Sequence, residues 1–115
     1  MDSLSSSLII KALDGLSTRA LVTAQNIANS ATPGYRPLRV SFEQVLAAAS
    51  GQGVAAIDAV TPQIEPAEVV TGMGSDMRLD LELATAASTS LRYGALIEVL
   101  NRQMQLNSIA ISGTR

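Results

Sequence analysis

The chain has 115 residues, a length that allows one domain, and it contains neither cysteine nor histidine. This composition excludes disulfides, thiolate nucleophiles, imidazole bases and most zinc sites. The net charge is −2 and the eight basic residues are scattered singly, so no basic stripe indicates a nucleic-acid partner.

The apolar residues make up 47% of the chain, but aromatic residues account for only 3% of it. Alanine, leucine, valine and isoleucine therefore supply most of the apolar surface, which favours packing of helix on helix. No segment reaches the ~18 apolar residues that span a bilayer. The N-terminus also lacks the pattern of a secretory signal, because Asp2 precedes any basic residue and Lys11 interrupts the apolar cluster. We expect any export to use no cleavable signal peptide.

Residues 3–31 are predicted to form one long helix. Apolar residues recur at every third or fourth position on one face, and a narrow polar stripe lies opposite. The apolar face consists of Ile9, Leu13, Leu16, Ala20, Ala24 and Ile27, and the stripe consists of Ser7, Lys11, Asp14, Thr18, Gln25 and Asn29. Since the apolar arc is wider than a coiled-coil seam, this helix needs partners on several sides. Gly15 costs the helix about 1 kcal/mol relative to alanine, which a close helix contact or simple tolerance would explain.

A ten-residue stretch then ends the helix and turns the chain over residues 32–37. Pro33 presets φ at the second position of a tight turn, and Gly34 accepts positive φ at the third. Asn29 suits a left-handed cap at the end of the helix. The stretch includes Asn26, Ile27, Ala28, Asn29, Thr32, Pro33, Gly34 and Tyr35.

The middle of the chain is predicted to be irregular. Residues 40–49 favour a short helix with Ser41 as its cap. Residues 54–78 are predicted to be an extended or loop segment, because prolines and glycines interrupt them and prolines do not occupy central strands.

Residues 80–112 are predicted to form the second long helix, with Asp80 as its N-cap. One heptad seam runs along it, and a second apolar line that includes Leu91 lies elsewhere on the cylinder. The seam consists of Ala86, Tyr93, Ile97, Leu100, Met104 and Ile111. We therefore predict a mostly α fold in which two long terminal helices pack as a coiled-coil-like pair, with a short third helix and an extended middle segment.

The stretch from Asn26 to Tyr35 resembles the signature of the axial proteins of the bacterial flagellum, the rod and hook family. That signature is Asn-Ile-Ala-Asn-x-x-Thr-Pro-Gly-Tyr, and this chain matches every fixed position. In the second helix, the residues from Leu79 to Leu83, from Leu91 to Tyr93 and from Ile111 to Gly113 are similar to a proximal rod member of the same family. Residues 50–75 carry no specific match.

The resemblance implies a structural subunit of the proximal rod that is fully ordered only in the assembled rod. Such subunits link the MS ring to the rest of the drive shaft, transmit torque and line the export channel in the periplasmic part of the basal body. The implied partners are other copies of the chain, the MS-ring protein and its FliE-type adaptor, rod proteins of the FlgC, FlgF and FlgG types, and the flagellar type III export apparatus. Assembly would use the apolar helix positions Ile9, Leu13, Leu16, Ala20, Ala24, Ile27, Leu91, Tyr93, Ile97, Leu100, Met104 and Ile111. The polar stripe of the first helix is a candidate for the channel lumen or a groove between subunits.

Three alternatives stay open from the sequence. The chain could be a proximal rod protein of the FlgC type, or a small helical adaptor or chaperone. The third is an enzyme with a two-carboxylate site, for which the middle segment offers Asp58, Glu65 and Glu68; no histidine or cysteine is present to activate a hydroxyl. We expect no enzyme, and no cofactor or metal.

Overall fold

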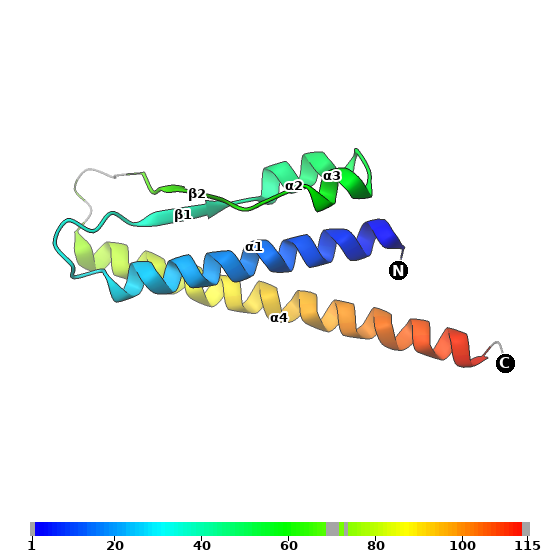
Figure 1. Cartoon of the computed structure of the whole chain (residues 1–115). Coiled ribbons are helices and arrows are strands. Elements are labelled where there is room, and N and C mark those ends of the chain that lie inside the picture. The colour runs from blue at the N-terminus through cyan, green and yellow to red at the C-terminus, as the bar shows by residue number, and fades with distance from the viewer. Residues whose placement is uncertain (1, 69–71, 73, 114–115) are drawn as a thin grey trace.

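Figure 1 shows the computed structural model of the chain, which describes residues 2–68, 72 and 74–113. The elements are α1 (Ser3–Ala28), β1 (Leu38–Ser41), α2 (Glu43–Ser50), α3 (Val54–Asp58), β2 (Gln63–Pro66) and α4 (Ser75–Gly113). The molecule is elongated, with extents of 64 × 26 × 17 Å. A mostly helical chain with one long helix at each end confirms the predicted fold class.

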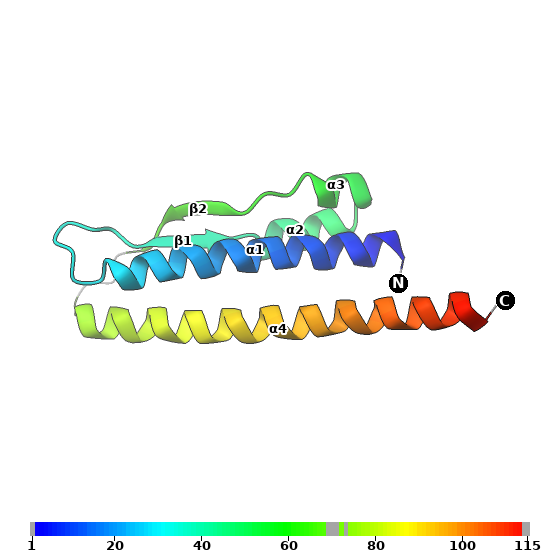
Figure 2. The same cartoon turned by 60° about the horizontal axis from the view of Figure 1, so that its bottom comes forward.

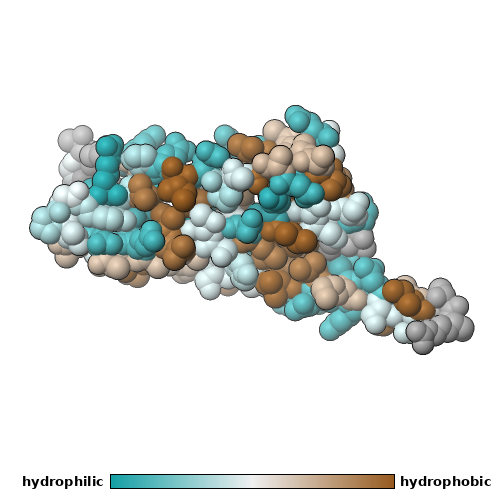
Figure 3. Space-filling model, viewed as in Figure 1, coloured by the Kyte–Doolittle hydropathy of each residue, from teal (hydrophilic) through white to brown (hydrophobic). Residues whose placement is uncertain are grey.

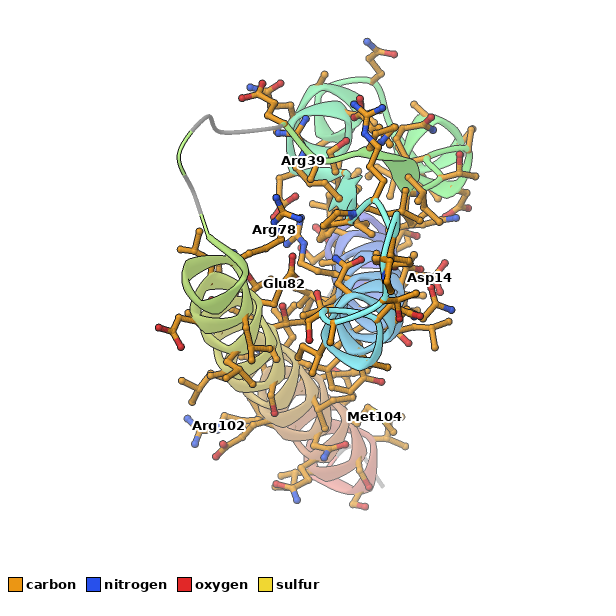
Figure 4. All side chains as sticks on the ribbon, turned by 90° about the vertical axis from the view of Figure 1, so that its left-hand side faces the viewer. Asp14, Arg39, Arg78, Glu82, Arg102 and Met104 are labelled. Carbon is orange, nitrogen blue, oxygen red and sulfur yellow. The ribbon has the colours of Figure 1, made fainter. Side chains whose placement is uncertain are left out.

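The elements form three layers, with α1 in the middle. Figures 1 and 2 show that α1 and α4 run antiparallel, and that the segment from β1 to β2 covers the side of α1 that faces away from α4. The end-on view in Figure 4 shows the same order, and Asp14 of the polar stripe points away from α4. The wide apolar arc of α1 therefore has two partners within its own chain.

The helix α1 begins and ends at side-chain caps. The Asp2 Oδ1 atom accepts a hydrogen bond of 2.7 Å from the Ser5 N–H, which satisfies one of the free donors of the first turn. The helix ends at Ala28, three residues before the predicted end. Asn29 caps it with φ −104°, and its side chain donates to the Gln25 carbonyl oxygen at 2.9 Å. The prediction that Asn29 caps in the left-handed region is therefore wrong, because its side chain completes the cap at negative φ.

The middle segment is more regular than predicted. β1 and β2 pair antiparallel, with Val40 opposite Ile64 and Ser41 opposite Gln63. The prediction that a helix begins at residue 40 is therefore wrong, because these residues pair with a strand more than twenty positions away. Ser41 donates to the Glu65 carboxylate at 3.1 Å instead of capping a helix. The short helix begins at Glu43, after a Phe42 that makes no side-chain cap.

Residues 54–78 also differ from the prediction of an extended segment, since helix occupies both of its ends. α3 covers Val54–Asp58 and follows Gly53, which has φ +101°. Four residues pair as β2, which ends at Pro66 on the edge of a two-stranded sheet, a position where proline is tolerated. Residues 69–71 and 73 lie outside the described residues.

The helix α4 begins at Ser75, so Asp80 lies inside it and is not the N-cap that the sequence predicts. The reason is tertiary packing, because Arg78 and Leu79 are half-buried where they line a small recess with Tyr35 and Pro37. Contacts with the loop after α1 thus extend the helix by more than one turn.

The hydrophobic core lies between α1 and the middle segment. Ile57 of α3 is fully buried, and all elements except α4 and β2 contribute to the buried set. That set comprises Leu16, Val22, Val40, Phe42, Leu46, Ala49, Ile57 and Val60. Among the described residues of α4, Leu96 is the one that packs against this core, and it is half-buried. None of the helices within residues 2–68 and 74–113 combines the length and apolar character needed to cross a membrane.

Candidate assembly interface

The predicted apolar face of α1 meets α4 at a groove. The groove has a volume of about 330 Å³ and no charged residue among those that line it. Its lining residues are Leu16, Ser17, Ala20, Ala24, Ile27, Ala86, Thr89, Ser90 and Tyr93. Small side chains on both helices leave it open, so Ala20, Ala24 and Ser90 are exposed although they lie between the two helices.

The groove brings together five of the twelve predicted assembly positions, namely Leu16, Ala20, Ala24, Ile27 and Tyr93. The others are placed elsewhere. Ile9 and Leu13 on α1, and Ile97 and Leu100 on α4, are half-buried. Met104 is 59% exposed and Leu91 is 76% exposed. Ile111 is 65% exposed. The first half of the heptad seam on α4 thus packs against α1, whereas its second half is exposed.

The side chain of Asn26 closes the loop after α1. It is 3% exposed, and its oxygen accepts hydrogen bonds from the Tyr35 hydroxyl at 2.9 Å and the Leu38 N–H at 3.0 Å. Its amide nitrogen donates to the Leu38 carbonyl oxygen at 2.8 Å and to Glu82 at 3.2 Å. An aspartate would have no donor for these acceptors, so the position requires an amide. Figure 4 shows Glu82 of α4 pointing toward α1, which places this amide where α1, β1 and α4 meet.

The turn itself has short-range hydrogen bonds. The Tyr35 N–H donates to the Thr32 carbonyl oxygen at 3.2 Å, and Gly34 has φ +78°. The Thr32 hydroxyl donates to Asn29 Oδ1 at 3.2 Å. Ala28 is the last residue of α1, and Pro33 is exposed in the turn. The signature residues therefore hold the loop against the end of α1, and Ile27 alone among them lines the groove.

A second cluster, which the sequence analysis missed, joins α1 to the start of α2. The Arg19 guanidinium makes two hydrogen bonds of 2.7 Å to Glu43 and one of 2.8 Å to the Val40 carbonyl oxygen. It also lies 4.9 Å from the centroid of the Phe42 ring, and the same ring packs on Gly15. The hydrogen bonds from Arg19 lower the pKa of Glu43 to about 2. Gly15 was the one sequence signal for this cluster, and its contact proves to be an aromatic ring and not a helix.

The side chains of the predicted polar stripe on α1 are not all exposed to solvent. The Lys11 ammonium donates to the Val60 carbonyl oxygen at 3.1 Å, so it is used within the chain. Asp14 and Gln25 are exposed.

The carboxylates of the middle segment are placed apart from the groove. Glu65 on β2 accepts from Ser41 and lies 3.8 Å from Arg39, while Asp58 and Glu68 are exposed. Among the described residues, no group of three or more acidic side chains is placed to hold a metal ion.

The exposed apolar surface of the described residues lies mainly on α4. Nine of the thirteen exposed large hydrophobic side chains in the described residues lie on α4. In Figure 3 an apolar patch lies on its projecting end, beside the grey terminal residues. An exposed apolar surface of this extent is typical of a protein that associates with other chains.

The chain is similar to one curated protein of known class, the flagellar basal body rod protein FlgB of Cereibacter sphaeroides. The two are 28% identical over 116 aligned positions, which cover 84% of each chain. No protein-family model matches the sequence, and no solved structure matches it. This similarity supports an assignment of the chain to the flagellar rod family, whose signature the residues from Asn26 to Tyr35 resemble.

Proposed function

We propose that the chain is a FlgB-type structural subunit of the proximal rod of the bacterial flagellar basal body. The observation that carries the proposal is the exposed apolar surface of α4, in a chain similar to FlgB over 84% of both lengths. A subunit of a shaft needs such surface on several sides, because each copy shares the load with its neighbours. This apolar surface is buried by the heterologous contacts between copies, which build an open helix of subunits.

In this role the chain links the MS ring to the rest of the drive shaft, transmits torque and lines the export channel. Its partners are other copies of itself, the MS-ring protein with its FliE-type adaptor, and rod proteins of the FlgC, FlgF and FlgG types. It reaches the periplasmic rod through the flagellar type III export apparatus. The residues Asn26 to Tyr35 set the angle at which the middle segment leaves the end of α1, and the apolar faces of α1 and α4 meet the neighbouring subunits.

The test is whether the chain is a component of isolated basal bodies. An epitope placed at the exposed Gln52, in the turn between α2 and α3, leaves both long helices intact. We expect the tagged chain to purify with basal bodies, and a density map to place it at the ring-proximal end. Density one position further along the rod would favour the FlgC type. A tagged chain that stays in the cytosol with one partner would contradict the proposal and favour an adaptor or chaperone.

A pair of substitutions at Leu91 shows whether the α4 surface is responsible. Leu91→Asp places a charge on a side chain that is 76% exposed, so the melting temperature of the purified chain should hardly change. The charge would have to be desolvated in the assembly, and we expect the variant to be absent from basal bodies. Leu91→Ala is the matched control, because it keeps the position apolar and helical, and it should assemble. Equal incorporation of both variants would remove this surface from the interface.

A further inference from the structure

The end of α4 projects beyond the rest of the molecule. α4 has 39 residues and α1 has 26, so α4 is the longer helix by 13 residues. Figures 1 and 2 show this end passing the N-terminus of α1. From Met104 to Gly113 every residue is exposed, and Leu106 and Ile109 are 51% and 67% exposed. No charged residue occurs between Arg102 and Gly113.

The groove between α1 and α4 has matching properties. It too presents no charge, so an apolar helix could enter it without desolvating an ion. An engineered cavity of roughly 150 Å³ accepts a benzene molecule. A groove of about 330 Å³ therefore has room for about two large apolar side chains.

The two features cannot meet within one molecule. The groove is lined by α1 residues from Leu16 to Ile27, in the C-terminal half of that helix, whereas the projecting end lies beyond its N-terminus. We infer that the groove of one copy receives the projecting end of α4 from a second copy, with Leu106 and Ile109 as the inserted side chains. A protrusion on one copy that fits a recess at the opposite end of the next gives a heterologous contact, which can propagate without closing. This inference rests on the proposed function, and it names the residues through which one subunit contacts the next.

The absence of cysteine from the sequence makes cross-linking a direct test. Ala24→Cys places a thiol in the groove, and Ile109→Cys places one on the projecting end. The two full-length variants, distinguishable by a mass tag, are purified separately, mixed and oxidised. We expect a mixed disulfide-linked dimer, and severalfold less product from either variant alone.

Leu91→Cys is the matched control, because this side chain also lies on α4 and is even more exposed. Mixed with Ala24→Cys, it should give severalfold less mixed dimer than Ile109→Cys gives. Equal yields from the two mixtures would overturn the inference, as would preferential coupling of Ile109→Cys to itself, which indicates a symmetric contact between ends. An absence of cross-linking in both mixtures would overturn it too.

Failure of this inference can be told apart from failure of the proposed function. Ile109→Lys, in the chain tagged at Gln52, should be lost from basal bodies while its circular dichroism and melting stay those of the parent. If the Lys variant still assembles, the tip-in-groove contact is wrong and the rod assignment stands. If the parent chain itself is missing from basal bodies, the rod assignment is wrong.

Discussion

At the scale of single residues, Gly15 has the most crowded surroundings of the eight glycines. A Cβ atom built on it would lie 2.5 Å from the Phe42 ring, closer than real Cβ contacts come. The ring has little room to retreat, since Phe42 is only 4% exposed and the Arg19 guanidinium lies over its face. Gly15 thus allows the ring to pack on the α1 backbone, and this contact compensates for the poor helix propensity of glycine.

Replacing Gly15 by alanine should therefore destabilise the chain, although the same change in an open helix stabilises it by up to about 1 kcal/mol. Overpacking of a tight site costs about 1–3 kcal/mol, so we expect the net free energy of unfolding to fall. Urea denaturation followed by circular dichroism measures it. Gly94→Ala is the matched control, because a Cβ atom added there would have open space around it, and it should raise stability. A stabilised Gly15→Ala variant would show that the ring moves aside easily.

At the scale of elements, the Arg19–Glu43 pair ties α1 to the beginning of α2. Arg19 is 16% exposed and Glu43 is 50% exposed on their side chains, and Arg92 of α4 lies 3.9 Å from the same carboxylate. Hydrogen bonds from Arg19 lower the pKa of Glu43 from 4.5 to about 2. A carboxyl group with a lowered pKa stabilises the fold above its unfolded pKa and loses that contribution as the pH falls through its folded pKa.

The stability of the chain should therefore fall as the pH is lowered from about 4.5 to about 2. Because Glu43 is half exposed, solvent screening limits the contribution of the pair to about 1 kcal/mol. Glu43→Gln should lower the urea midpoint at neutral pH and flatten its decline in that acid range. Glu65→Gln, which removes the looser 3.8 Å pair with Arg39, should change little. A parent and a Glu43→Gln variant with parallel pH profiles would contradict the role of this pair.

At the scale of the whole molecule, the chain has one well-packed side and one open side. The core lies between α1 and the middle segment, while Thr89 is the one buried residue within residues 78–113 of α4. Segments with few buried apolar contacts open at low free energy. The expectation that the terminal helices become ordered only on assembly therefore applies to α4 more than to α1.

Amide hydrogen exchange of the dilute chain should show this asymmetry. We expect slow exchange around Leu16 and Val22 of α1, and fast exchange over residues 104–113. The latter should become protected in the assembled rod, because neighbouring subunits then cover them. Uniform protection of α4 in the dilute monomer would mean that the helix is stable without neighbours.

The sequence by itself determined the two long helices, the turn at Gly34 and the apolar faces, because each depends on periodicity or on the φ preference of one residue. The sequence also marks Asn26 as part of the signature, but it does not predict the four hydrogen bonds through which the Asn26 side chain holds the loop. Only the tertiary structure decided that Val40 and Ser41 form a strand, that α4 begins at Ser75, and that Phe42 packs on Gly15 with Arg19 over its ring. These features depend on contacts between residues far apart in the chain, and local preferences carry no information about such partners. For the same reason, the division of the apolar faces between core, groove and exposed surface could be assigned only from the packing of the elements.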